Sequence, residues 1–189
     1  AFNYLPYLGT DTYTPEELQK EFFKYGLSMD VYTAEDRCYV YMSGLQKSFD
    51  KGVEMLEHVL ANVAPDQQAY TDYVDGILKK RSDAKLNKNT ILWNRLFDYG
   101  KYGPDNPKTN IISEDELKTI DPTQLTDLIK DIYSYKHRMF YYGSEELASV
   151  TPVIDKFHNV PEELKEYPEP RKFEELTTSD NTVYFVDYD

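Results

Sequence analysis

Hydrophobic positions near the start of the chain recur at the spacing of an α-helix. Leu18 and Phe22 lie four residues apart, and polar residues fill the positions between them. Thr14 and Glu17 form a capping-box pattern, with a proline directly after the threonine. A glycine, the usual helix-ending residue, closes the run. The pattern predicts a helix over residues 14–25.

A residue-by-residue alternation then replaces the helical spacing. Through residues 37–43, tyrosines alternate with smaller hydrophobic side chains, which is typical of a strand with one buried face. Residues 28–32 form a second strand-like stretch, and the short link 33–36 between the two is typical of a hairpin. The pattern predicts two antiparallel strands directly after the first helix.

Helical spacing returns after Ser48 and continues through most of the remaining chain. The predicted elements are helices over 48–63, 65–86 and 91–99, capped helices that begin at Ser113, Asp121 and Ser144, and a strand over 139–142. Few strands among many amphipathic helices, with a hairpin in place of regular strand–helix alternation, favour the α+β class. We expect an antiparallel sheet with its helices packed on one face.

The last part of the chain differs in composition from the rest. Residues 161–181 begin with three prolines and many glutamates, which is typical of a linker. Alternating hydrophobic residues resume at position 182 and predict a strand. The sequence therefore predicts a folded domain over 1–160, an acidic, proline-containing linker over 161–181, and a strand within 182–189.

The composition of the chain argues against several classes of function. The chain of 189 residues carries 34 acidic and 21 basic side chains, a net charge of −13, which disfavours the phosphate contacts of a nucleic-acid-binding protein. No run approaches the roughly 20 apolar residues of a membrane-spanning helix. Cys38 is the single cysteine, so an internal disulfide and a cysteine-based zinc site are both excluded.

One group of ionisable residues has metal-ligand spacing. Glu54 and His58 lie four residues apart on a predicted helix, and Glu57 between them could act as a base beside a bound zinc ion. The alternative is that the three form the solvated face opposite the apolar stripe, and glutamate-rich helix faces of that kind are common. The other histidines, His137 and His158, are not at metal-ligand spacing from each other or from this group.

Three segments, in order and spacing, resemble a known family. Residues 7–10 end in Gly-Thr, residues 30–36 read Asp-Val-Tyr-Thr-Ala-Glu-Asp, and residues 140–143 read Phe-Tyr-Tyr-Gly. The chain up to about residue 158 resembles the pitrilysin/insulinase metallopeptidases, the inverzincins, which include the mitochondrial processing peptidases. The resemblance implies their α+β fold, in which repeated domains enclose a chamber and only one repeat holds zinc. It also implies that the strand from residue 182 opens the following repeat.

The same resemblance implies that this repeat holds no zinc. The family's H-x-x-E-H motif would place its first histidine before Ala1, as expected of a domain truncated at its N-terminus, its glutamate at Asn3 and its second histidine at Tyr4. An amide is not a general base, and a phenol with a pKa of about 10 is a poor zinc ligand at neutral pH. The third ligand, a glutamate, would fall near residues 77–81, where the sequence is Ile-Leu-Lys-Lys-Arg.

In the family, an extended peptide pairs with a strand edge. The matching residues here are Asp30, Val31, Tyr32 and Thr33, and a strand edge can accept a peptide through main-chain groups alone. The alternative is an ordinary strand covered by neighbouring domains.

Three functions are consistent with these residues. The first is a catalytically inert domain of a larger zinc protease, which forms chamber wall and packs on other domains of the same polypeptide; zinc would lie in a different domain, and the protease's peptide substrate would be a further partner. The second is a stand-alone interaction protein on the same fold. The third is a metal-dependent hydrolase that uses Glu54, Glu57 and His58, which predicts zinc that is lost in His58→Ala. The compartment is left open.

Overall fold

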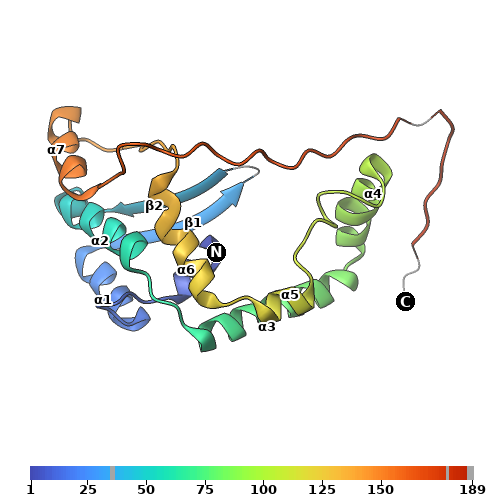
Figure 1. Ribbon diagram of the computed structural model, residues 1–189, viewed down its shortest axis with the longest axis horizontal. Helices are drawn as coiled ribbons and strands as arrows, with labels where there is room; N and C mark the ends of the chain where they lie inside the picture. The colour runs from blue at the N-terminus through green and yellow to red at the C-terminus, as the bar shows by residue number, and fades with distance from the viewer. Residues whose placement is uncertain (35–36, 178, 187–189) are drawn as a thin grey trace. The chain divides into compact units, whose positions relative to one another are not determined.

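The computed structural model describes residues 1–34, 37–177 and 179–186. Contacts divide the chain into two compact units. The first combines Ala1–Tyr70 with Asp121–Pro168, and the second combines Thr71–Ile120 with Glu169–Asp189. Each unit is described by itself below, and Figure 1 shows the elements of both.

The first unit begins with a short 3-10 helix, a capped α-helix and a hairpin. The elements are η1 (Phe2–Tyr7), α1 (Pro15–Tyr25), β1 (Leu27–Ala34) and β2 (Arg37–Gly44). Thr14 and Glu17 form the predicted capping box, and Gly26 ends α1 with a φ of 62°. The strands are antiparallel, and their register runs from Leu27 opposite Gly44 to Ala34 opposite Arg37. The predicted helix and hairpin are confirmed; the centre of the link, residues 35 and 36, lies outside the described residues.

Helix α2 (Phe49–Asn62) follows the single turn η2 (Gln46–Ser48) and packs against β2. The close contact depends on Gly52, because a Cβ there would lie 3.2 Å from Leu27 and 3.6 Å from Met42. Val53, Met55, Val59 and Leu60 are buried along the helix. Ser48 differs from the prediction in one respect: its hydroxyl donates to the carbonyl of Tyr25 at 2.7 Å and does not cap α2.

Three later elements complete the first unit. They are α6 (Pro122–Lys130), the short η4 (Asp131–Ser134) and α7 (Leu147–Phe157), and both α6 and α7 pack against α2. The strand predicted over 139–142 is wrong, because no strand is assigned there and the side chains of Phe140 and Tyr142 lie in solvent. The backbone pairs a few residues earlier instead, through an isolated bridge between Tyr135 and Lys165.

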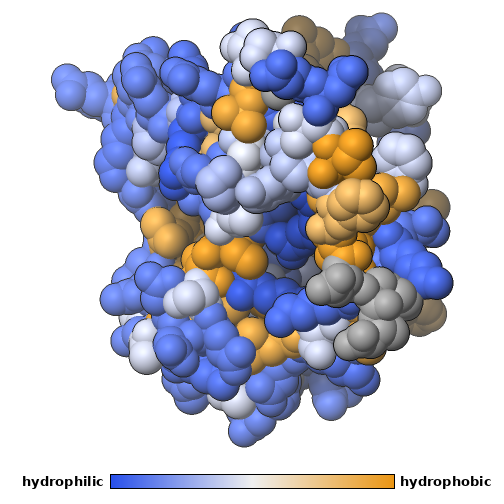
Figure 2. Space-filling view, turned by 90° about the vertical axis from the view of Figure 1, so that its right-hand side faces the viewer, coloured by the Kyte–Doolittle hydropathy of each residue, from blue (hydrophilic) through white to orange (hydrophobic). Residues whose placement is uncertain are grey.

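The second unit is helical in its described part. Its elements are the part of α3 (Gln67–Lys85) from Thr71 onward, the π-helical η3 (Thr90–Leu96), α4 (Phe97–Tyr102) and α5 (Glu114–Thr119). A loop after α4 is closed by the buried side chain of Asn106, which donates to Gly103 O at 2.8 Å and accepts from Lys108 N at 2.9 Å. Figure 2 shows the face of the molecule on the α4 side, where hydrophobic side chains lie among hydrophilic ones at the surface.

The C-terminal segment contacts the second unit at several points. Leu176 N donates to Lys101 O at 2.8 Å, and Arg171 binds the carboxylate of Asp105. Residues 182–186 are not assigned to a strand, and 187–189 lie outside the described residues. A strand needs a partner, and the proposed partner would belong to a following repeat, so the predicted boundaries at 160 and 181 and the strand after them stay predictions.

Candidate functional site

Tyr4, the position expected of a metal histidine, is a core residue. It lies in η1, its side chain is 0% exposed, and its hydroxyl donates to the main-chain carbonyl of Asp66. The rings of Tyr4 and Tyr70 pack edge to face, with their centres 5.6 Å apart. Burial raises the pKa of Tyr4 and keeps its phenol neutral. A neutral phenol that is committed as a donor does not fit a zinc ion.

The neighbouring Asn3 does not complete a catalytic pair. Its side chain is exposed, whereas Tyr4 points into the core, so the two residues face different surroundings. An amide cannot take a proton from water as the family's glutamate does. The residues at these two positions therefore do not fit a zinc ion and its general base.

The Gly-Thr pair that follows η1 forms a tight structural turn. A Cβ on Gly9 would lie 2.4 Å from the carbonyl oxygen of Tyr13, so only glycine fits there. The hydroxyl of Thr10 accepts from the backbone of Tyr13 at 3.1 Å and lies 3.0 Å from Nε2 of His58. Thr10 also pairs with Val63 in an isolated bridge. These two residues fix the end of η1 to the end of α2.

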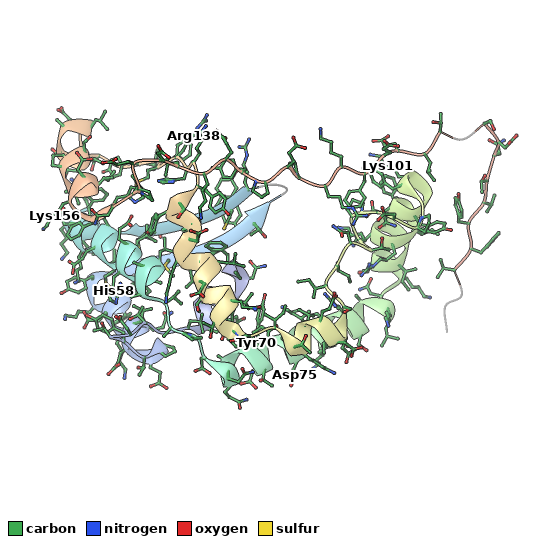
Figure 3. All side chains as sticks on the ribbon, viewed as in Figure 1. His58, Tyr70, Asp75, Lys101, Arg138 and Lys156 are labelled. Atoms are coloured by element: carbon green, nitrogen blue, oxygen red, sulfur yellow. The ribbon has the colours of Figure 1, made fainter. Side chains whose placement is uncertain are left out.

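The three candidate ligands on α2 do not converge. Glu54 pairs with Lys51 at 2.9 Å, whereas Oε1 of Glu57 lies 2.9 Å from Nδ1 of His158. His58, labelled in Figure 3, contacts Thr10 through Nε2. Among the residues that the structure describes, no three His, Cys, Asp or Glu side chains form a group able to hold a metal ion.

The alternative, a common solvated face, is wrong for Glu57. Glu54 is exposed, but Glu57 is only 8% exposed. The reason is that α2 packs against both α6 and α7, so a second side of the helix is covered. A buried carboxylate needs a partner, and His158 at the end of α7 supplies it.

The structure assembles a cluster of ionisable groups that the sequence pattern did not reveal. Nε2 of His158 lies 2.8 Å from Nε2 of His137, and Nδ1 of His137 lies 2.7 Å from the carbonyl oxygen of Tyr135. The ring of Tyr133 packs edge-on against His158, with centres 5.2 Å apart. We call Glu57, Tyr133, His137 and His158 the histidine cluster. Glu57 on α2 is distant in the sequence from the other members, which lie on η4, beside it and after α7, so no local spacing could have indicated the whole cluster.

The hydroxyl oxygen of Tyr133 is buried inside the histidine cluster. It makes no hydrogen bond of normal geometry to any described residue. Burial is the main reason why the pKa of Tyr133 lies far above its usual range, and the nearby carboxylate of Glu57 raises that pKa further. The phenol is therefore neutral at any physiological pH.

The four residues of the candidate peptide edge lie on β1, and their role in binding a peptide stays a prediction. In the described part of the chain β1 pairs with β2 and with no other strand. The N–H of Val31 donates to the carboxylate of Asp30 at 2.8 Å, so an added strand would compete with this contact. Tyr32 stacks on Tyr39 with ring centres 4.7 Å apart, and Tyr41 meets Tyr32 edge-on at 6.4 Å.

The basic stretch expected near the third ligand position lies on α3. Lys79 and Lys80 are exposed, and Arg81 donates to the carbonyl oxygen of Ile112 at 2.8 Å. These residues belong to the second unit and Tyr4 belongs to the first. Repulsion of a cation by the combined site therefore stays a prediction.

Comparison with known proteins agrees with the α+β domain described above. The family model "Insulinase (Peptidase family M16)" matches residues 3–100, more than half of the chain. The chain belongs to the insulinase family, peptidase family M16. The β subunit of the mitochondrial processing peptidase of Neurospora crassa is 21% identical over 141 residues, which is 75% of this chain and 29% of that protein.

Two solved structures share the fold. A mutant of the ferredoxin protease FusC, in complex with Arabidopsis ferredoxin, superposes with a TM-score of 0.74 at 11% identity. A protease from Helicobacter pylori superposes with a TM-score of 0.63 at 16% identity. They match 93% and 92% of this chain, but only 19% and 43% of their own chains. The α+β class is thereby confirmed. No helix in the described part of the chain is long and apolar enough to cross a membrane.

Proposed function

We propose that this chain is a catalytically inert domain of a larger family M16 protease and contributes chamber wall and interdomain contacts. The supporting observation is the commitment of Tyr4 to the core, where it donates to Asp66 and packs on Tyr70. A metal ligand must turn a lone pair toward an open site, and the hydroxyl of Tyr4 is turned into the protein. Asn3 beside it cannot act as a general base.

The lengths of the relatives support a role as one part of a longer polypeptide. The chain spans 29% of the processing-peptidase subunit and 19% of the ferredoxin protease. Zinc and its ligands would lie in a different domain of the parent, so the parent, and not this chain, would carry out proteolysis. Other domains of the same polypeptide are then the first partners, and the parent's peptide substrate is a further one.

The hairpin is the part of the first unit that we assign to the chamber side. Tyr32 and Tyr39 are directly opposite in the register, and Tyr41 is two residues from Tyr39, so all three project from one face. Tyr32 and Tyr41 are each 47% exposed. Half-exposed tyrosines give a surface that is apolar and can also form hydrogen bonds, which suits contact with varied peptides. The edge at Asp30, Val31, Tyr32 and Thr33 would offer main-chain groups beside it.

The first experiment tests inertness on the purified chain. Zinc content is measured by mass spectrometry after equilibration with zinc and gel filtration, and cleavage is measured on a library of fluorogenic peptides. We expect neither stoichiometric zinc nor turnover. The matched variant is His58→Ala: zinc bound by the wild type and lost in this variant would overturn the proposal in favour of a hydrolase.

A second experiment tests the chamber role in the parent protein. Replacing Tyr32 and Tyr41 by serine is expected to raise KM for peptide while kcat and zinc content stay unchanged, because these side chains contact substrate away from the metal. Replacing the exposed Phe23 on α1 by serine is the control. An unchanged KM would refute the assignment of this face. A parent reading frame without any H-x-x-E-H stretch would favour the stand-alone interaction protein instead.

A further inference from the structure

The histidine cluster contains two imidazole rings whose hydrogen-bond partners can be counted. Nδ1 of His158 lies 2.9 Å from the Glu57 carboxylate, and Nδ1 of His137 lies 2.7 Å from the carbonyl oxygen of Tyr135. The two remaining ring nitrogens, both Nε2, lie 2.8 Å from each other. Each distance is that of a hydrogen bond, so each contact needs one hydrogen.

The number of available hydrogens decides the charge of the cluster. A carbonyl and an ionised carboxylate only accept, so both Nδ1 atoms must carry a hydrogen. A neutral imidazole has only one N–H, and two neutral rings would therefore point two lone pairs at each other across 2.8 Å. One additional proton between the two Nε2 atoms removes this repulsion.

The total number of protons in the cluster is the same whether Glu57 or His158 is drawn as the protonated group. If Glu57 were the protonated group and donated to Nδ1 of His158, the hydrogen of His158 would sit on Nε2 and point at His137. This arrangement also satisfies all three contacts, and it holds the same total number of protons. In either form the cluster holds one proton more than an ionised carboxylate and two neutral rings.

We propose that His137 and His158 share one proton between their ε-nitrogens, balanced by Glu57, and that this shared proton fastens the first unit together. The three groups come from α2, from the segment after η4 and from the residue that ends α7. The contact therefore joins three stretches of chain that are distant in the sequence. It needs the shared proton and the carboxylate that balances it, so a substitution that removes that carboxylate weakens the contact.

Some of the surrounding charges stabilise the shared proton, and others destabilise it. Glu57 stabilises the proton, since its side chain is 10% exposed and that of His158 is 11% exposed, and charges interact strongly in such surroundings. Tyr133, on η4, is neutral. The cations that flank the pair in the sequence oppose the proton, and some of them are engaged elsewhere. They are Lys136 and Arg138, on either side of His137, and Lys156, two residues before His158. Lys136 pairs with Glu166, and Lys156 lies over the ring of Phe157.

Two further acids on these elements are paired with lysines. Glu54 on α2 pairs with Lys51, and Asp131 on η4 pairs with Lys165. Asp155 on α7 adds a further negative charge to that helix. Glu57 is thus the carboxylate that contacts the ring pair directly, and it is the residue on which the proposal can be tested.

The test is nitrogen-15 NMR of the histidine side chains in the intact chain, after treatment with a chelator. We expect a scalar coupling across an N–H···N hydrogen bond between Nε2 of His137 and Nε2 of His158. The coupling should be absent in Glu57→Gln under the conditions where the wild type shows it. His58→Asn, a change on the same helix, is the control and should keep the coupling.

Two results would overturn the proposal. One is a spectrum in which both rings are neutral, with hydrogen on Nδ1 and no coupling, at every pH where the chain is folded. The other is a ring pair whose Nε2 signals change when the chelator is added and return with zinc, since a metal ion would then take the place of the proton. If Glu57→Gln does not fold, His137→Gln serves instead because His137 is exposed, and it must convert Nε2 of His158 to a nitrogen without hydrogen.

Discussion

Tyr4 and the histidine cluster differ in what the sequence led us to expect of each. The family resemblance places chemistry at Tyr4, and the structure places a core side chain there, fully buried and bound to Asp66. No motif marks Glu57, His137 and His158, and the structure brings their ionisable groups within hydrogen-bond distance. A position to which a family resemblance assigns chemistry can thus hold a core side chain, whereas this ionisable cluster arises where separate helices meet.

The largest expected effect tests whether Tyr4 is structural. Tyr4→Ala should lower the free energy of unfolding by about 3–5 kcal/mol, because a large buried aromatic side chain is lost and a cavity is left. Tyr4→Phe keeps the ring and removes the hydroxyl that donates to Asp66, so it should cost about 0.5–1.5 kcal/mol. Equilibrium unfolding in urea measures both changes.

Phe23→Ala is the control for this pair, since Phe23 is 88% exposed and its loss should change stability by less than about 0.5 kcal/mol. If Tyr4→Ala were no more harmful than Phe23→Ala, Tyr4 would not be a core residue, and the contrast with the histidine cluster would fail.

The next effect concerns the charge inside the histidine cluster. Glu57→Gln should lower the free energy of unfolding by about 1.5–3 kcal/mol at a pH of about 6, because a largely buried hydrogen bond between charged groups is lost.

Glu54→Gln is the matched control, three residues away on the same helix. Its pair with Lys51 is half exposed, so its loss should be within the error of the measurement at every pH. Equal losses of stability in the two variants would show that the cluster carries no special charge.

The third effect concerns the turn that holds η1 in place. Gly9→Ala should destabilise the chain by about 1–3 kcal/mol, because the new Cβ would meet the carbonyl of Tyr13. Gly76→Ala on α3 has no atom within 4 Å of its new Cβ and should be neutral or stabilising by up to about 1 kcal/mol. Thermal unfolding of the two variants separates steric conflict from the general effect of replacing a glycine. A harmless Gly9→Ala would mean that the Gly-Thr pair is not needed for this turn.

Local signals in the sequence were sufficient for much of the fold. The Thr14 and Glu17 cap and the glycine after α1 act within one helical turn, and the alternation of tyrosines acts within one strand, so each predicts its element directly. Ser48 shows the limit of such signals. The residue type is that of a cap, but its hydroxyl binds Tyr25 instead because the chain brings α1 and α2 together there.

The histidine cluster and the wrong strand at 139–142 share one cause. Glu57 and His158 are 101 residues apart, and the bridge between Tyr135 and Lys165 likewise joins distant segments. Pairing at this range depends on how α6 and α7 pack on α2, which no local pattern encodes. The degenerate positions Asn3 and Tyr4 came from the family resemblance, but the packing of Tyr4 against Tyr70 required the structure.

The smallest expected effect concerns His58, which lies beside Glu57 in the sequence but contacts the Gly-Thr turn. His58→Ala should cost about 0.5–1.5 kcal/mol, because one hydrogen bond to Thr10 is lost at a half-buried position. It should leave the coupling between His137 and His158 intact, whereas Glu57→Gln should abolish it. The experiment would then show that His58 anchors η1 and that Glu57 carries the charge of the cluster. Loss of the coupling in His58→Ala would instead join the two regions into one network and remove the contrast between them.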